Sequence, residues 1–165
     1  MDAIAAGLDL GTILPTGRLD HGADRMPLCP PVSISQADVR QMQLAKGAIA
    51  AGVQILLERL GAKADDLERV YIAGAFGNYV NLRSANRIGM LPFPIGKAFP
   101  AGNTALQGAK IALFADPSKP DPWNGILERM EHVPLSADPR FQEIYVEQML
   151  FPELAPESRA AGPGG

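Results

Sequence analysis

The pattern of hydrophobic and polar positions predicts a chain built mainly of helices around one short buried strand. The longest helix is predicted from Ser35 to Leu60, where apolar side chains recur at three- and four-residue steps: Val39, Met42, Ala45, Ile49, Val53, Leu56 and Leu60. Ser35 and Asp38 have the spacing of a capping box, and Gly61 is a typical helix stop. We therefore expect a long amphipathic helix that packs this stripe on a sheet.

A strand-turn-helix unit is predicted in the middle of the chain. Val70–Ala73 has the character of a buried strand, 74–78 is a turn with two glycines, and 82–90 follows as a helix that Asn81 can cap. Glycines let a ligand or another backbone come close, and the first turn of a helix leaves N–H groups free to donate. Such a corner suits a nucleotide. A purely structural tight turn stays an open alternative, because short glycine motifs are common.

The other elements are predicted from local signals, and no internal repeat is apparent. They are the end of a helix at 1–8, a loop rich in Pro, Gly and Asp at 20–33, a second glycine turn at 100–104 that opens a helix through Phe114, a helix near 123–130, a last helix at 139–150 capped by Ser136 or Asp138, and a disordered tail at 153–165.

Composition removes several classes of function. The 165 residues are 47% hydrophobic and 20% charged, with a net charge of −3 and interspersed signs, so we expect neither a nucleic-acid partner nor a membrane surface. The N-terminus lacks the layout of a signal peptide, and the expected location is the cytoplasm. Cys29 is the only cysteine, so the chain forms no internal disulfide and no thiolate cluster. His21 and His132 share no ligand spacing with acidic residues, and no metal site is expected.

Two smaller features invite a functional interpretation. The Asp-x-Gly-Thr phosphate hairpin of actin-like ATPases is matched by Asp9, Gly11 and Thr12. The alanine-rich sequence ahead of them has helical spacing, whereas the hairpin needs a strand there, so we do not expect a phosphate loop. On the long helix, Gln43 and Lys46 are expected in solvent when judged without a family context. Beside them, a face of small residues would let another element approach closely: Gly47, Ala48, Ala51 and Gly52.

Five blocks in one order carry a resemblance to a known family. They are Asp38–Ile49, Val70–Tyr79, Arg87–Pro92, Gly102–Lys110 and Phe141–Pro152. In this order they resemble the C-terminal domain of the ATP-dependent reductive activators of corrinoid proteins. The resemblance covers nearly all of residues 2–152, which makes it far more specific than a single glycine turn.

The resemblance implies an α/β fold of the actin-like ATPase (ASKHA) type, with a small sheet covered by helices. Members of the family use ATP with Mg²⁺ to drive one-electron reduction of a Co(II) corrinoid to Co(I), on a partner corrinoid protein of a methyltransferase system. They typically carry a 2Fe–2S domain at the N-terminus. By the same resemblance, the nucleotide-binding residues correspond to the adenosine loop and to the facing helix: Gly74, Ala75, Phe76, Gly77, Asn78, Gln43 and Lys46.

Departures from the family pattern limit the expected activity. The chain has no cysteine cluster for an iron–sulfur centre, and the first phosphate loop and the metal-positioning acid have no counterpart. We therefore expect a fragment (1–152) that holds one wall of the nucleotide cleft and no catalytic residue, with at best weak nucleotide binding and no turnover by itself. A non-catalytic interaction module that uses the small-residue face, and a different actin-like kinase, stay as alternatives. The corrinoid protein served and the oligomeric state, a homodimer included, stay open.

Overall fold

The computed structural model describes residues 1–116, 118 and 123–153. The predicted disordered tail lies outside this part, apart from Glu153. The helices are α1 (Asp2–Asp9), α2 (Gln36–Arg59), α3 (Gly74–Tyr79), α4 (Leu82–Arg87), α5 (Thr104–Leu113), α6 (Asn124–Leu127) and α7 (Phe141–Glu147), with short 3₁₀ turns at Asp20–Gly22, Ala64–Asp66, Ile95–Lys97 and Leu135–Ala137. The strands are β1 (Arg25–Cys29), β2 (Val32–Ser35), β3 (Val70–Ala73) and β4 (Ala98–Gly102). None of the described helices is long and apolar enough to cross a bilayer.

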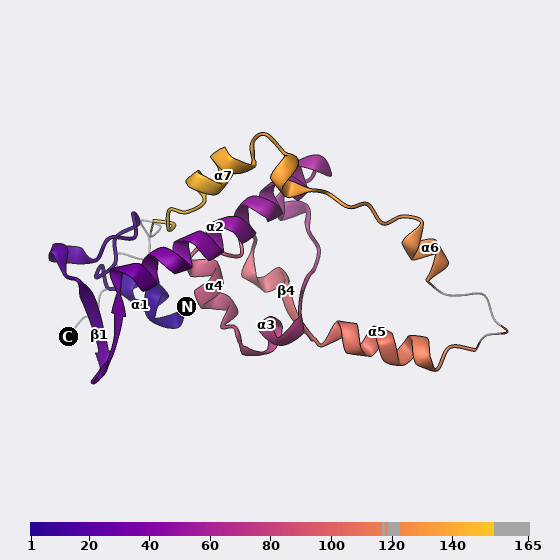
Figure 1. Cartoon of the computed structure of the whole chain (residues 1–165), viewed down its shortest axis with the longest axis horizontal. Helices are drawn as coiled ribbons and strands as arrows, with labels where there is room; N and C mark the ends of the chain where they lie inside the picture. Colours follow the sequence, from indigo (N-terminus) through magenta and orange to yellow (C-terminus); the bar gives the residue numbers. More distant parts are fainter. Residues whose placement is uncertain (117, 119–122, 154–165) are drawn as a thin grey trace.

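Helix α2 runs through the body of the molecule, and its ends are the predicted ones (Figure 1). The Ser35 side chain accepts from the backbone N–H of Asp38, and the Asp38 carboxylate accepts in return from the Ser35 N–H, which completes the capping box. At the other end Gly61 takes a φ of +64°, the left-handed conformation that stops a helix.

The buried face of α2 differs from the predicted stripe. Ile49 is 40% exposed, Leu56 42% and Leu60 78%. In the second half of the predicted apolar stripe, only Val53 packs against the main core. The buried face instead carries Gln43, Lys46, Gly47, Ala50, Ala51, Gly52 and Ile55. The rotation has a physical cause, because Gln43 and Lys46 donate to backbone carbonyls of the C-terminal segment, and α7 packs on the glycines beside them.

The small-residue face of α2 is covered from within the chain. A side chain at Gly47 would meet the carbonyl oxygens of Tyr145 and Gln148, and one at Gly52 would meet Leu135. Ala51 is fully buried, and only Ala48 is exposed. The close approach of another element that these small residues predicted is made by α7 and the turn before it, and this leaves less support for the alternative in which a separate partner packs on the face.

Helix α7 itself is shorter than predicted and starts without a side-chain cap. Its N-cap is Arg140, and neither Ser136 nor Asp138 takes that position. The Asp138 carboxylate accepts from the Arg140 backbone N–H, and the Arg140 guanidinium pairs with Glu58 of α2 at 2.6 Å. The start of α7 is thus fixed by contacts with α2.

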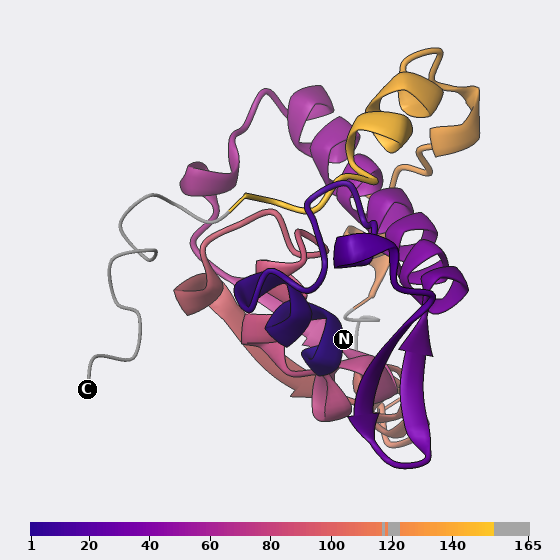
Figure 2. The ribbon, with the colours of Figure 1, turned by 90° about the vertical axis from the view of Figure 1, so that its left-hand side faces the viewer.

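The four strands of the described residues form two separate two-stranded sheets. β1 and β2 make an antiparallel hairpin over residues 25–35. The sequence predicted a loop at 20–33, which contains most of this hairpin. The hairpin projects from the body (Figure 2). β3 pairs in parallel with β4, a strand that the sequence did not predict, because prolines and glycine interrupt it.

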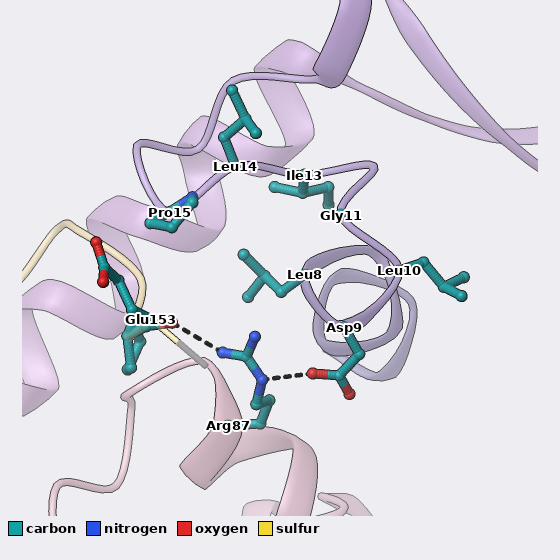
Figure 3. Close-up of a pocket in the computed structure, with 10 residues that line it drawn as sticks. Leu8, Asp9, Leu10, Gly11, Ile13, Leu14, Pro15, Arg87 and Glu153 are labelled. Atoms are coloured by element: carbon teal, nitrogen blue, oxygen red, sulfur yellow. Dashed lines mark hydrogen bonds and ion pairs between the residues drawn. The ribbon is translucent and has the colours of Figure 1, made fainter. Parts of the chain in front are cut away.

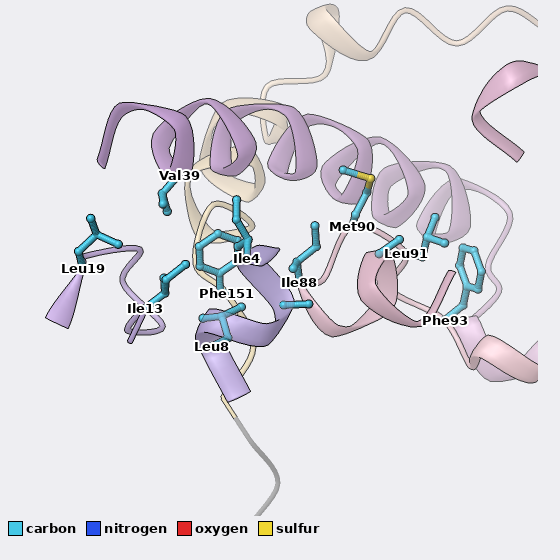
Figure 4. Close-up of a cluster of buried hydrophobic side chains, with 12 residues drawn as sticks. Ile4, Leu8, Ile13, Leu19, Val39, Ile88, Met90, Leu91, Phe93 and Phe151 are labelled. Atoms are coloured by element: carbon cyan, nitrogen blue, oxygen red, sulfur yellow. The ribbon is translucent and has the colours of Figure 1, made fainter. Parts of the chain in front are cut away.

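The main core lies where α1, α2, α4 and the C-terminal segment meet. Ile4, Leu8, Val39, Ile88 and Phe151 are among its fully or almost fully buried side chains, and Figure 4 shows Phe151 between α1 and α2. A smaller cluster joins α2 and α7 through Ala51, Ile55 and Ile144. α5 and α6 contribute no residue to either core and form an arm that extends away from the body (Figure 1).

The predicted glycine turn after β3 is a short helix, α3. Gly74 begins it with a φ of +78°, and a side chain at this position would find open space. A side chain at Gly77 would collide with the carbonyl oxygen of Ile72 in β3. Gly77 therefore serves the close packing of α3 on the strand that precedes it.

This packing gives a first prediction. We expect Gly77→Ala to lower the free energy of unfolding by about 1–3 kcal/mol, because the added methyl group forces α3 away from β3. Gly108→Ala in α5 is the control, since an added Cβ there meets nothing, and we expect it to be neutral or slightly stabilising. Urea denaturation measures both, and equal stability of the two variants would contradict this packing.

Candidate functional site

The carboxyl ends of β3 and β4 lie next to each other and form the candidate site. In the parallel register, Ala73 at the end of β3 pairs with Gly102 at the end of β4. A helix follows each strand end, α3 directly and α5 after Asn103. The two glycine turns of the sequence are thus brought together at one edge, which is the edge where open α/β sheets bind ligands.

Both strand ends turn through a glycine in the left-handed conformation. The φ angle is +78° at Gly74 and +65° at Gly102, values that residues with a Cβ rarely adopt. The Asn103 carboxamide oxygen accepts from the Leu106 N–H at 3.0 Å and caps α5. The predicted residues Ala75, Phe76, Gly77 and Asn78 lie in α3, directly beside this edge. Gly102 and Asn103 belong to the same edge, and the similarity of the two glycine turns was the signal for them in the sequence.

Gln43 and Lys46 occupy a different place, under the C-terminal segment. Gln43 is 4% exposed, and its side-chain N–H donates to the carbonyls of Thr16 and Met149, both at 3.1 Å. Lys46 is 1% exposed, and its amine donates to the Leu150 carbonyl. The expectation that both are solvated is wrong. Their contact with a nucleotide stays a prediction, and their described hydrogen bonds are all to backbone carbonyls of the protein.

Three side chains hold three of the four carbonyls of the segment 149–152, which we call the C-terminal strap. Besides Gln43 and Lys46, Arg87 donates from Nη1 to the Pro152 carbonyl at 2.9 Å, and the Phe151 N–H donates to the Pro15 carbonyl at 2.9 Å. The Lys46 amine also lies 5.7 Å from the centre of the Phe151 ring, within range of a cation–π contact. The strap is therefore tied to α2, to α4 and to the segment after α1.

Burial changes the acid–base behaviour of Lys46. Removal of its amine from water disfavours the charged form and lowers the pKa from its ordinary value of 10.5 to about 8. The Leu150 carbonyl and the Phe151 ring favour the charged form and oppose this effect. Part of the lysine population is therefore neutral at mildly alkaline pH.

Beside the strap lies a cavity of about 580 Å³, bordered by the end of α1, α4 and Glu153. Arg87 lies at its wall and pairs through Nε with the Asp9 carboxylate at 2.6 Å (Figure 3). Two carboxylates, Asp9 and Glu153, line the same space. Nucleotide phosphates would be repelled by them, so this cavity does not suit a nucleotide.

The Asp-x-Gly-Thr segment forms the end of a helix, as its alanine-rich context predicted. Asp9 is the last residue of α1, and Gly11 has a φ of +72°, the usual conformation after a helix C-terminus. The Thr12 hydroxyl donates to the Gly7 carbonyl, within the same turn. No phosphate hairpin forms at these residues.

Possible metal ligands lie apart from one another in the described part of the chain. Among residues 1–116, 118 and 123–153, no three His, Cys, Asp or Glu side chains come close enough together to hold a metal ion. Cys29 is exposed, at the end of β1.

Comparison with known families and structures decides the family. Residues 19–159 match the model of the C-terminal domain of RACo, the ASKHA domain. The chain belongs to this family. The small two-stranded sheets packed with helices are thus part of an ASKHA-type α/β domain, as the resemblance implied.

Relatives with assigned roles are corrinoid activators. Over 121 residues the chain is 40% identical to the corrinoid activation enzyme RamQ of Eubacterium limosum, which covers 73% of this chain and 20% of RamQ. Over 153 residues it is 30% identical to the [Co(II) methylated amine-specific corrinoid protein] reductase of Methanosarcina barkeri, covering 92% of this chain and 28% of that protein. The chain therefore spans between a fifth and three tenths of the length of these relatives.

A solved structure supports the same assignment. The reductive activator for corrinoid, iron–sulfur protein matches with a TM-score of 0.75 and 28% identity, over 92% of this chain and 27% of that one. As a member of the RACo C-terminal domain family, the chain corresponds to one part of a considerably longer protein in each of these relatives.

Burial of Lys46 gives a second prediction, on the pH dependence of stability. The folded-state pKa of about 8 lies below the ordinary value of 10.5, so the folded protein holds the lysine proton less tightly than the unfolded chain. Below pH 8 the amine is charged in the folded and in the unfolded protein, so its burial lowers the free energy of unfolding by the full amount. As the pH rises toward 10.5, the folded protein holds the neutral amine and this loss of stability disappears. We expect wild type to gain roughly 2 kcal/mol of stability relative to Lys46→Met over this window.

Denaturant titration at a series of pH values measures the difference. Lys110→Met, on the exposed surface of α5, is the matched control for the loss of a lysine amine that is not buried. A constant difference between wild type and Lys46→Met would show that the amine is not buried as the structure has it.

Proposed function

We propose that the chain is the nucleotide-binding part of an ATP-dependent activator that reduces inactive Co(II) corrinoid proteins to Co(I) for methyl transfer. The proposal rests on the adjacent carboxyl ends of β3 and β4, which turn through Gly74 and Gly102, in a chain of the RACo C-terminal domain family. The names of the relatives support the corrinoid protein as the partner.

The chemistry of the edge supports contact with an adenosine group. A nucleoside needs close approach to backbone, and a Cβ at Gly74 would stand in open space, so the surface above this residue is free for a ligand. The residues that would contact the nucleotide are Gly74–Asn78 together with Gly102 and Asn103. The bound ATP, with Mg²⁺, would supply the free energy for activation.

The remaining parts of the activity belong to the same proposal. An electron source, expected to be a 2Fe–2S centre, would come from residues with no counterpart in this chain, since its single cysteine cannot hold a cluster. Asp9–Thr12 forms a helix end, so the phosphate-binding groups would also come from elsewhere. A domain boundary at residue 152 and a cytoplasmic location are further parts of this proposal.

The alternative functions receive less support. The interaction module was based on the small-residue face of α2, and α7 covers that face. A different actin-like kinase would need an acid at the carboxyl edge of β3 and β4 to activate its substrate. The residues after these strand ends, 74–78 and 102–104, include no acidic side chain.

Titration with ADP tests the proposal in the isolated chain. We expect saturable, weak shifts of the backbone amide resonances of Gly74–Asn78, Gly102 and Asn103 in nitrogen–proton correlation spectra. Gly74→Leu should remove these shifts because its side chain fills the space above the edge. Gly11→Leu is a matched control, since Gly11 has a similar positive φ and equally open surroundings at the end of α1.

Two results would contradict the proposed site. One is the absence of any saturable shift up to millimolar ADP, and the other is equal loss of binding in Gly74→Leu and Gly11→Leu. Amide shifts confined to Gln43, Lys46 and their neighbours would instead indicate that the nucleotide binds beside the strap.

A further inference from the structure

An exposed tyrosine ends the helix that borders the candidate nucleotide site. Tyr79 is the last residue of α3, and it is 88% exposed. Its side chain makes no hydrogen bond and no ring contact with the described part of the chain. This distinguishes it from Tyr71 and Phe99 on the neighbouring strands, whose rings pair with their centres 6.4 Å apart. The fold of the described residues therefore leaves the Tyr79 ring in water.

The helical geometry of α3 turns Tyr79 away from the sheet. Gly77 faces β3, because a Cβ added there would meet the Ile72 carbonyl. Successive residues of a helix are rotated by about 100°, so Tyr79, two positions later, lies on the side of α3 opposite to β3. Helical side chains lean toward the N-terminus and cover the turn before their own residue. We therefore expect the ring to lean back along α3, toward the strand ends at Gly74 and Gly102.

The tyrosine and the glycine at the strand end are separated by about the length of a nucleoside. Gly74 and Tyr79 are the first and last residues of α3, five positions apart, which corresponds to about 7–8 Å along the helix axis. A ligand that contacts the backbone at Gly74 can therefore reach the tyrosine ring with its other end. The residues after the two strand ends, 74–78 and 102–104, include no acidic side chain that would repel a phosphate.

An accessible aromatic ring is the side chain on which a nucleobase stacks. Both partners have flat faces, and a tyrosine offers this area with only two side-chain torsions to fix. We propose that Tyr79 stacks on the base of the bound nucleotide and forms the base-binding wall of the candidate site. The ribose then lies between the tyrosine ring and the glycine at the end of β3. This inference rests on the proposed function and adds to it the residue that recognises the base.

Proton spectra of the 165-residue chain titrated with ADP test the stacking directly. A base stacked on Tyr79 moves the signals of its ring protons upfield, because they then lie in the ring current of the adenine. We expect saturable upfield shifts of these signals, with the same saturation curve as the backbone amides of Gly74 and Gly102. The ring signals of Tyr145, which stacks on Phe141 in α7, should stay constant.

Substitutions separate the role of the ring from that of the hydroxyl group. Tyr79→Ala should weaken ADP binding by at least about fivefold, the lower limit for the loss of one base–aromatic stack. Tyr79→Phe keeps the ring and should bind ADP nearly as tightly as wild type. Phe114→Ala is the matched control and should leave ADP binding unchanged. Phe114 is 83% exposed, but it follows the last residue of α5, about 15 Å from the start of that helix.

Three results would overturn the inference and leave the proposed function intact. The first is a set of saturable amide shifts at the two strand ends while the Tyr79 ring signals do not move. The second is equal weakening of ADP binding by Tyr79→Phe and Tyr79→Ala. The third is an upfield shift of Tyr71 or Phe99 in place of Tyr79, because the base would then lie on the sheet. The absence of any saturable shift in wild type would contradict the proposed function itself, and this inference with it.

Discussion

The arrangement of the main body depends on the docking of the C-terminal strap in the core. Phe151 fills the space between α1 and α2, and this brings the carbonyls of Met149 and Leu150 into partly buried positions (Figure 4). Buried carbonyl groups are costly without a donor. Gln43, Lys46 and Arg87 supply these donors, which explains why a long amphipathic helix places an amide and an amine on its buried face.

The end of the molecule at the strap and the end at β3 and β4 differ in how far their surfaces are covered. At the strap, polar side chains and backbone groups satisfy one another, and Arg87 closes the arrangement by pairing with Asp9. At the other end, β3 and β4 expose an apolar face and a pair of glycine corners, and α5 extends from them without a covering element. The strapped end is held by the core and by these polar contacts, while the open end is the place where we propose the nucleotide contact.

Local chemistry was enough to predict several elements. The capping box at Ser35 and Asp38, the cap at Asn81 and the strand 70–73 depend on residues a few positions apart, and each is found where the sequence placed it. The helical nature of the segment before Asp9 was also predictable, because alanine-rich spacing outweighs a four-residue motif.

Long-range contacts account for what the sequence did not predict. Met149 and Leu150, whose carbonyls accept from Gln43 and Lys46, lie more than a hundred positions away, so neither the burial of these side chains nor the rotation of the α2 face could be inferred from periodicity. β4 contains proline and glycine and is a strand because β3 pairs with it, and the β1–β2 hairpin forms in a segment whose composition favours a loop. The resemblance to a family predicted an adenosine corner at 74–78, which stays a prediction, and it did not show that the second glycine turn lies beside this corner.

Hydrogen exchange at the Phe151 amide tests the docking of the strap most directly. This N–H donates to the Pro15 carbonyl at 2.9 Å, in a position that only a docked strap provides. The account predicts that it exchanges as slowly as the amides in the buried middle of α2, such as that of Ala50. Exchange at the rate of an unstructured amide, while α2 stays protected, would contradict it.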